Sequence, residues 1–247
     1  MNKIVIDNIT NNSINYKKED NKYIFDIENN TDIDLIVNLN NIEIIFNIKE
    51  NIILNIKRIS DVGNNIKYVY NLDRNSSLFY NSFLTTEGND EEHHIYLNEE
   101  YANVDFKIRT ISKNTENYKI YVYHKANNTN SNILLRGVNN EGTIHFYVLG
   151  EVLKDIKNCY VNQDNRIYTF NQNKCTIDPI LLIENNDVVA NHAAFIGKFE
   201  EETLFYLMSR GISKNNAIKL LVRGFLNIDN DEEILSIINK YWRWYNA

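Results

Sequence analysis

Residues 187–225 read DVVANHAAFIGKFEEETLFYLMSRGISKNNAIKLLVRGF, and this stretch is the most informative part of the 247-residue chain. It joins a buried-looking strand, which contains a single histidine, His192, to a helical hairpin. Three glutamates at 200–202 crowd the start of the first helix, where carboxylates favour the positive end of the helix dipole. Arg210 and Gly211 then mark the end of that helix.

Two more helices are predicted after Gly211. Ser213 supplies an N-cap for the second helix, in which small and apolar residues recur at helical spacing. The third helix starts at Asp229 or Asn230 and carries a stripe of apolar residues that needs a covering surface. The stripe consists of Ile234, Ile237, Ile238, Tyr241, Trp242 and Tyr245.

Before residue 187 the dominant pattern is an alternation of apolar and polar residues, which predicts many short strands. The clearest runs are 23–27, 33–39, 42–44, 52–56, 104–108, 120–122 and 144–148. Their irregular spacing fits either a sandwich or a solenoid in which each coil contributes two or more strands. The abundant asparagine has two interpretations, asparagine stacks in solenoid turns or a biased genome. Its spread through every kind of segment favours genome bias.

The stretch 187–225 resembles the C-terminal signature of the SufB/SufD family, the scaffold subunits of the SUF iron–sulfur cluster assembly machinery. The matching positions follow one another without gaps: Asp187, Val188, His192, Ala194, Gly197, Glu202, Leu204 to Leu207, Ser209 to Ile212, Ala217, Gly224 and Phe225. Weaker similarity runs back through Pro179-x-Leu181-x-Ile183 and Gln163-x-Asn165-Arg166 to Gly150.

The resemblance implies a mainly β fold with two parts. Residues 1–197 would form a right-handed parallel β-helix, or solenoid, and residues 198–247 a small C-terminal α-helical domain. SufB-type chains carry a cluster-building cysteine at about the position of Asp164, while Cys175 falls too late to match. The chain therefore resembles SufD more than SufB, and a minimal paralogue that pairs with itself is the alternative.

The resemblance also implies partners and a site. A SufC-like ABC ATPase would dock on the helical hairpin, and a SufB-like subunit or a second copy of the chain would pair with the β-helix. His192 would lie near the interface between the two scaffold subunits, where imidazole can bind iron or pass a proton. From the residues alone, a structural histidine is the better interpretation. The predicted docking residues are Leu204, Phe205, Leu207, Arg210, Leu220, Leu221 and Phe225.

The cysteine content predicts that the isolated chain carries no stable iron–sulfur cluster, and the resemblance implies a transient cluster in the assembled complex. Cys159 and Cys175 are the only cysteines, and they lack the spacing of cluster ligands. Two buried small residues are the simpler interpretation. The histidine pair in the acidic run 89–94 would have to lie in a loop to reach one metal ion, because neighbouring strand residues point to opposite faces. A solvated loop without metal is predicted for that run.

Other functional classes find little support in the sequence. P-loop, GxGxxG, GxSxG and HExxH motifs are absent, which predicts a protein that is not an enzyme. The net charge of -7 argues against nucleic acid as a partner. Neither a signal peptide nor a membrane span is recognisable, which predicts a cytoplasmic protein without a membrane partner. A β-helix that binds or degrades polysaccharide remains an alternative, and so does a purely structural solenoid that associates with itself.

Overall fold

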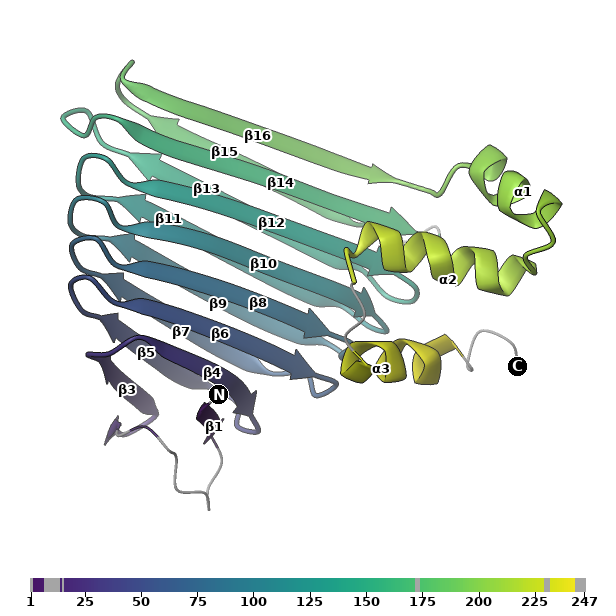
Figure 1. The fold of residues 1–247 in the computed structure, drawn as a ribbon, viewed down its shortest axis with the longest axis horizontal. Helices are drawn as coiled ribbons and strands as arrows, with labels where there is room; N and C mark the ends of the chain where they lie inside the picture. Colours follow the sequence, from purple (N-terminus) through teal and green to yellow (C-terminus); the bar gives the residue numbers. More distant parts are fainter. Residues whose placement is uncertain (1, 7–13, 15, 172–173, 229–231, 243–247) are drawn as a thin grey trace.

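A computed structural model describes residues 2–6, 14, 16–171, 174–228 and 232–242. The chain winds into a β-solenoid of about seven turns, followed by three short helices (Figure 1). Apart from one short hairpin near the start, successive strands alternate between two eight-stranded sheets, which form the two broad walls of the solenoid. The predicted β-solenoid with a C-terminal helical segment is thus confirmed, and the sandwich alternative is wrong.

We call the two walls sheet 1 and sheet 2. Sheet 1 consists, in order, of β1 (Asn2–Ile6), β4 (Thr31–Val37), β6 (Ile53–Ser60), β8 (Ser77–Leu84), β10 (Asn103–Ser112), β12 (Asn130–Asn139), β14 (Cys159–Thr169) and β16 (Val188–Gly197). Sheet 2 consists of β2 (Lys17–Glu19), β3 (Lys22–Ile27), β5 (Ile42–Ile48), β7 (Asn65–Leu72), β9 (Asn89–Leu97), β11 (Glu116–His124), β13 (Ile144–Val152) and β15 (Thr176–Ile183). All pairs are parallel except the short hairpin of β2 and β3.

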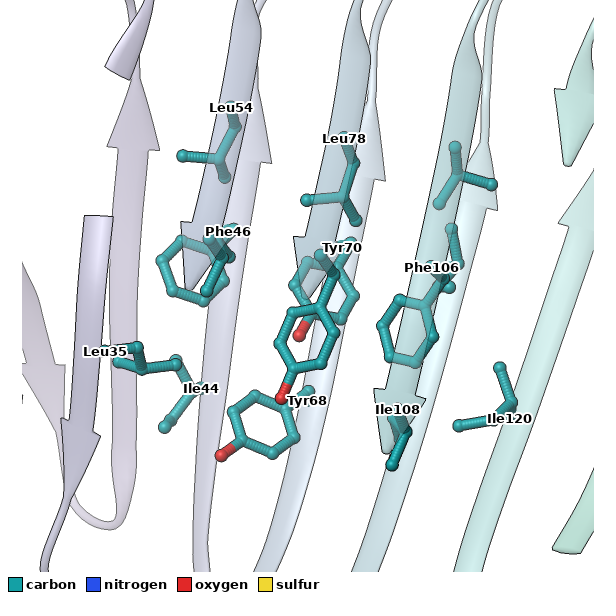
Figure 2. Close-up of a cluster of buried hydrophobic side chains, with 14 of the residues drawn as sticks. Leu35, Ile44, Phe46, Leu54, Tyr68, Tyr70, Leu78, Phe106, Ile108 and Ile120 are labelled. Atoms are coloured by element: carbon teal, nitrogen blue, oxygen red, sulfur yellow. The ribbon is translucent and has the colours of Figure 1, made fainter. Parts of the chain in front are cut away.

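The alternating residues explain the two-walled form, because each strand turns every second side chain into the interior. Phe46, Tyr70 and Phe106 are among the large side chains that fill this interior (Figure 2). The rings of Phe46 and Tyr70 stack with centroids 5.7 Å apart. The interior is therefore a continuous apolar core with each coil stacked on the one before it.

Asparagines occupy many of the corners between strands. Asn51, Asn75 and Asn128 have positive φ angles of 62°, 52° and 60°, a conformation that asparagine tolerates better than most residues. The Asn75 side chain also donates a hydrogen bond to the Asn51 side chain one coil earlier, at 2.8 Å. Asparagine stacks therefore contribute to the solenoid, although genome bias was the favoured interpretation.

The helices begin and end close to the predicted residues. They are α1 (Glu201–Ser209), α2 (Lys214–Phe225) and α3 (Glu232–Trp242). Gly211, at a φ angle of 84°, follows α1 and lets the chain reverse. Ser213 is the N-cap residue of α2, but its side chain makes no capping hydrogen bond. The predicted start of α3 at Asp229 or Asn230 lies outside the described residues, as do the side chains of Tyr241, Trp242 and Tyr245.

Helices α2 and α3 cover one end of the outer face of sheet 1, whereas α1 projects beyond the end of β16 (Figure 1). Val222 of α2 and Ile234 of α3 pack in one apolar cluster with Phe83, Ile111 and Val138 of sheet 1. This contact supplies the surface that the apolar stripe of the third helix requires. The division into units 1–197 and 198–247 stays a prediction.

Candidate functional site at the open end of the solenoid

The last strand, β16, forms an uncovered edge of sheet 1 (Figure 1). In the parallel register with β14, His192 lies beside Gln163, and Gln163 points into the solenoid. His192 therefore lies on the inner face of the wall. It is exposed because no later described coil covers it.

The prediction of a buried strand at this position is wrong. Val189, Phe195 and Ile196 are 59%, 44% and 43% exposed. The local sequence is apolar enough for a core strand, but no later described coil packs on β16, and only Val188 and Ala190 at its start pack against the buried cluster of Val152, Cys159 and Val161. An exposed edge strand with apolar side chains marks an interaction surface.

Beneath His192, the inner face of β14 carries two buried amides, Gln163 and Asn165. The amide nitrogen of Gln163 donates to the backbone oxygen of Ile180 at 3.2 Å, while its side-chain oxygen has no hydrogen-bond partner. Both side-chain polar atoms of Asn165 also lack a partner. A Cβ atom on Gly150 would lie 3.2 Å from the Gln163 nitrogen, so the glycine leaves room for this side chain. The open end thus has a polar interior below its one histidine.

The outer face of β14 carries an ionic cluster instead. Asp164 accepts hydrogen bonds from the guanidinium groups of Arg136 at 2.5 Å and Arg166 at 2.8 Å. Partial burial acts to raise the pKa of Asp164, but the two arginines outweigh it, and the pKa lies below its usual range. A carboxylate in a salt bridge therefore occupies the place where the resemblance puts the SufB cysteine.

The two cysteines lie in polar hydrogen-bonded settings. Cys159 is buried, as predicted, with its sulfur 3.2 Å from the Thr129 hydroxyl. Cys175 is only partly buried, and its sulfur accepts a hydrogen bond from the Asn139 side chain at 3.0 Å. Burial raises the pKa of the Cys175 thiol, which disfavours the thiolate that a metal ligand requires.

The hairpin residues predicted to dock a partner divide into two groups. Phe205, 73% exposed, Leu220, 46% exposed, and the exposed Arg210 face away from the solenoid. Leu204 and Phe225 instead pack against the apolar cluster between the helices and sheet 1, with the Phe225 ring edge-on to Tyr168 of β14 at 4.6 Å. Leu207 and Leu221 are partly buried. The structure therefore leaves only part of the predicted set available to a partner.

A cleft between α2 and α3 continues the exposed surface. Its volume is about 360 Å³, and its walls include Leu220, Arg223 and Leu235. Together with the exposed aromatic rings of Phe205 and Tyr206, it gives the helical segment an apolar surface edged with positive charge.

The run 89–94 is not a solvated loop, and that prediction is wrong. It begins strand β9, and its side chains alternate between the interior and the outer face, with His93 buried and His94 outside. Within the described residues no group of histidine, cysteine or carboxylate side chains could hold a metal ion. On the outer face, His94 stacks on Tyr121 with centroids 4.6 Å apart.

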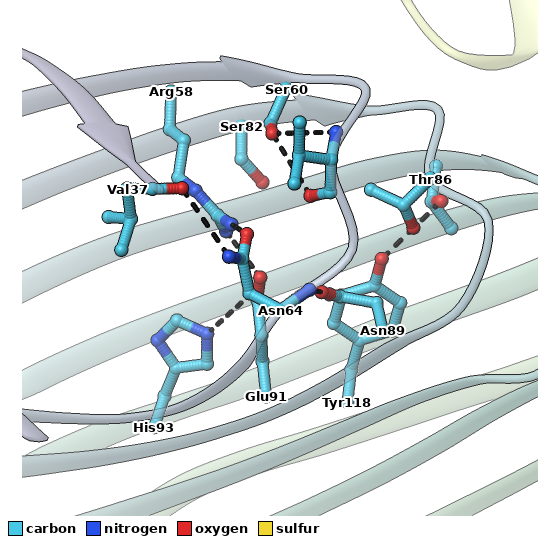
Figure 3. A network of polar contacts seen from close by, with 12 residues as sticks. Val37, Arg58, Ser60, Asn64, Ser82, Thr86, Asn89, Glu91, His93 and Tyr118 are labelled. Atoms are coloured by element: carbon cyan, nitrogen blue, oxygen red, sulfur yellow. Dashed lines mark hydrogen bonds and ion pairs between the residues drawn. The ribbon is translucent and has the colours of Figure 1, made fainter. Parts of the chain in front are cut away.

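In the interior of the solenoid, Glu91 and His93 belong to a polar network that was not predicted from the sequence (Figure 3). Glu91 accepts a charge-assisted hydrogen bond from Arg58 and lies 3.2 Å from the imidazole of His93. Arg58 also donates to the side chain of Asn64 at 3.3 Å. All four side chains are buried. The only signal in the sequence was the acidic and histidine-rich composition of residues 89–94. That composition is equally typical of an exposed segment.

The fold and this open end define a class of protein: a parallel β-solenoid with one uncovered terminal coil and a helical appendage beside it. A family model described as "SUF system FeS cluster assembly, SufBD core domain" matches residues 59–225. The chain therefore belongs to the SufB/SufD family. The match includes β16, His192 and the α1–α2 hairpin.

Individual relatives agree with this assignment. SufD of Bacillus subtilis is 33% identical over 114 residues, which cover 45% of this chain and 26% of SufD. SufB of the same organism is 35% identical over 112 residues, covering 42% of this chain and 23% of SufB. A SufBD family protein of Archaeoglobus fulgidus is 54% identical over 43 residues, covering 17% of this chain and 12% of that protein. The aligned segments span about a quarter or less of these relatives, and the two Bacillus proteins do not separate a SufD-like from a SufB-like chain.

No helix in the described part of the chain is long and apolar enough to cross a membrane.

Proposed function

We propose that this protein is a non-enzymatic scaffold subunit of a SUF-type iron–sulfur cluster assembly complex. The observation that carries the proposal is the open end of the solenoid, where an exposed apolar edge strand presents His192 above two buried amides. A SufB-like subunit or a second copy covers this end. A cluster then assembles at the covered interface, and His192 takes part as an iron ligand or proton carrier.

The helical segment supplies the second half of the proposal, the docking of a SufC-like ABC ATPase. Helix α1 has no buried residue, and it carries Phe205 and Tyr206 as exposed rings. An exposed apolar helical surface of this kind is typical of a site that binds a partner protein. The nucleotide cycle of the ATPase then moves the scaffold. A cytoplasmic location and the lack of a stable cluster on the isolated chain are part of the same proposal.

The test is co-purification of the chain with its bound subunits, followed by iron and sulfide analysis of the complex. Phe205→Asp places a charge at the exposed ring and should abolish ATPase binding, while the β signal in circular dichroism stays unchanged. Phe79→Asp is the matched control, because Phe79 is an exposed phenylalanine, 39% accessible, in sheet 1. Normal ATPase binding by Phe205→Asp would show that the docking surface lies elsewhere.

His192→Ala tests the site. Because His192 is exposed, its removal should lower the free energy of unfolding by no more than about 1 kcal/mol. Cluster formation on the assembled complex should fall sharply. Unchanged cluster formation in a well-folded variant would remove His192 from the site, and a large loss of stability would make it a structural histidine.

A further inference from the structure

A cluster of four aromatic rings joins the helical hairpin to the open edge of the solenoid. Its centre is Tyr168, which lies on the outer face of β14, close to the end of that strand. The Phe199 ring stacks on the Tyr168 ring with centroids 4.1 Å apart. The Phe225 ring, at the end of α2, meets it edge-on at 4.6 Å, and the Phe195 ring of β16 lies at 5.4 Å. One side chain therefore contacts β16, α2 and the link before α1.

The junction between β16 and α1 begins at a glycine, a residue that readily forms a hinge. Gly197 ends β16 and lies beside Tyr168 in the parallel register. A Cβ atom on Gly197 would lie 2.4 Å from the Phe195 ring, so the missing side chain lets that ring lie across the end of the strand. Phe195 before the glycine and Phe199 after it both pack on the Tyr168 ring. The cluster thus holds the two sides of the junction together.

The α2 side of the ring cluster is anchored to the solenoid as well. Phe225 packs against the apolar cluster between the helices and sheet 1, which includes the buried Val222 of α2. The guanidinium carbon of Arg136, on β12, lies 6.0 Å from the centroid of the Phe225 ring, within the range of a cation–π attraction. Arg136 also donates a hydrogen bond to Asp164 of β14. Helix α2 and Tyr168 are therefore joined through packed side chains as well as through the chain.

We propose that Tyr168 is a positioning residue that couples the hairpin to β16, so that a shift of α2 alters how firmly β16 and its His192 are held on the solenoid. The inference rests on the proposed function, because it names the link through which a protein bound to the hairpin acts on the open end. Among the described strands β16 pairs with β14 alone, so its position depends on the side-chain contacts that it makes with β14 and the helices. His192 and Phe195 belong to this one strand. Packing around Phe195 therefore bears on the position of His192.

Loss of the Tyr168 ring should uncouple the two elements. A leucine is too short to contact all three neighbouring rings at once, so Gly197 becomes a free hinge and the hairpin moves without β16. Tyr168→Phe keeps the ring and should behave as the unmodified chain does. Tyr160→Leu is the matched control, because Tyr160 is an outer-face tyrosine of the same strand, 41% exposed, at the opposite end.

Hydrogen exchange in β16 tests the coupling on the full chain, at one fixed protein concentration. Val222→Ala loosens α2 on sheet 1 and leaves the four rings in place. It should speed the exchange of the β16 amides about three-fold or more in the unmodified, Tyr168→Phe and Tyr160→Leu chains, but leave their rate unchanged in the Tyr168→Leu chain. An equal effect in all four chains, or no effect in the unmodified chain, would overturn the inference. Phe199→Leu, which removes the stacked ring from the link, should uncouple in the same way and replaces Tyr168→Leu if that variant does not fold.

The native complex separates this inference from the proposed function. Tyr168→Leu should bind the ATPase as the unmodified chain does, because the exposed Phe205 and Leu220 are unchanged, but cluster formation per complex should fall about ten-fold. Tyr168→Phe should restore it. Unchanged cluster formation by complexes that contain Tyr168→Leu would overturn the inference and leave the scaffold function standing. If the unmodified chain binds no ATPase and forms no cluster, the proposed function fails, while the exchange experiment still decides whether Tyr168 couples the hairpin to β16.

Discussion

A buried ion pair between Arg58 and Glu91 lies inside the solenoid, where most other side chains are apolar (Figure 3). Burial opposes ionisation, but the adjacent guanidinium outweighs it and lowers the pKa of Glu91 to about 2. The Tyr68 ring stacks on the His93 ring, with centroids 4.5 Å apart, and so lies beside the network. Removal of either charge would leave the other uncompensated in the interior, a loss of typically 3–5 kcal/mol.

Glu116 is a second buried carboxyl, and it behaves in the opposite way. It accepts hydrogen bonds from the hydroxyls of Thr86 at 2.8 Å, Thr110 at 2.5 Å and Tyr118 at 3.0 Å, and none of these groups carries a positive charge. Burial raises the pKa of Glu116 to about 7, and the negative charge of Glu91 adds to the effect. The folded chain therefore keeps this proton at pH values where the unfolded chain has lost it.

We predict that Glu116 makes the protein less stable as the pH rises from about 4.5 to about 7. In this window the unfolded chain binds fewer protons than the folded chain, so the free energy of unfolding falls with pH and levels off above 7. The free energy of unfolding should fall by roughly 2–4 kcal/mol in total. Each unit of difference between the pKa values of Glu116 in the folded and the unfolded chain contributes about 1.4 kcal/mol.

Glu116→Gln should remove this dependence, because the amide keeps the shape of the side chain and does not ionise. Urea unfolding of both proteins at pH 5 and pH 8 measures the effect. His93 and His124 titrate in both proteins, so their contributions cancel in the difference. A difference between the two proteins that is the same at both pH values would contradict the prediction.

At the scale of elements, the helices were the most predictable part of the chain. Their ends are encoded locally, by the glutamates at 201 and 202 and by Gly211, so that no distant contact is needed to recognise them. Strand β9 was missed for the opposite reason. Its inward residues Glu91 and His93 are polar, and their partner Arg58 lies 33 residues away from Glu91 in the chain. Single-segment periodicity cannot detect a polar inner face that a distant strand satisfies.

Helix α2 combines two different roles on its two faces. Val222 is fully buried against the outer face of sheet 1, whereas Leu220 is 46% exposed. Val222→Ala should lower the free energy of unfolding by about 1.5–3 kcal/mol, because it deletes two buried methyl groups and leaves a cavity.

Leu220→Ala, on the same helix, is the matched comparison. It should change the free energy of unfolding by less than about 0.5 kcal/mol, since surface substitutions usually do. It should nevertheless weaken ATPase binding, because Leu220 lines the cleft between α2 and α3. Equal losses of stability from the two variants would show that α2 does not pack as described.

At the scale of the whole molecule, the sequence could not decide between a solenoid and a sandwich. The register is set between coils: Ile33 lies beside Ile56, 23 residues later, and Ser131 beside Val161, 30 residues later. A repeat that lengthens along the chain leaves no fixed period to detect. The family resemblance identified the fold, while the exposure of β16 emerged only once the end of the solenoid was known.

A solenoid is held together by contacts between neighbouring coils, so its stability is not uniform along its length. The coil from β8 to β9 has neighbours on both sides and contains Glu91 of the buried network. Strand β16 pairs with β14 alone among the described strands. In a single chain we therefore expect amide hydrogens of β8 to exchange slowest and those of β16 to exchange much faster, because β16 can open without disturbing the other coils.

A second copy is one of the two subunits proposed to cover the open end, and its binding should slow the exchange of the β16 amides. A second copy seated there would shield the free backbone edge of β16, so its amides should become protected to an extent that depends on protein concentration. Val189→Lys should remove this protection and leave β8 unchanged, whereas Val62→Lys, at a similarly exposed valine outside β16, should alter neither. Hydrogen exchange measured peptide by peptide on the three proteins gives the answer. Fast exchange in β16 of the unmodified chain at every concentration would mean that the edge stays open in solution.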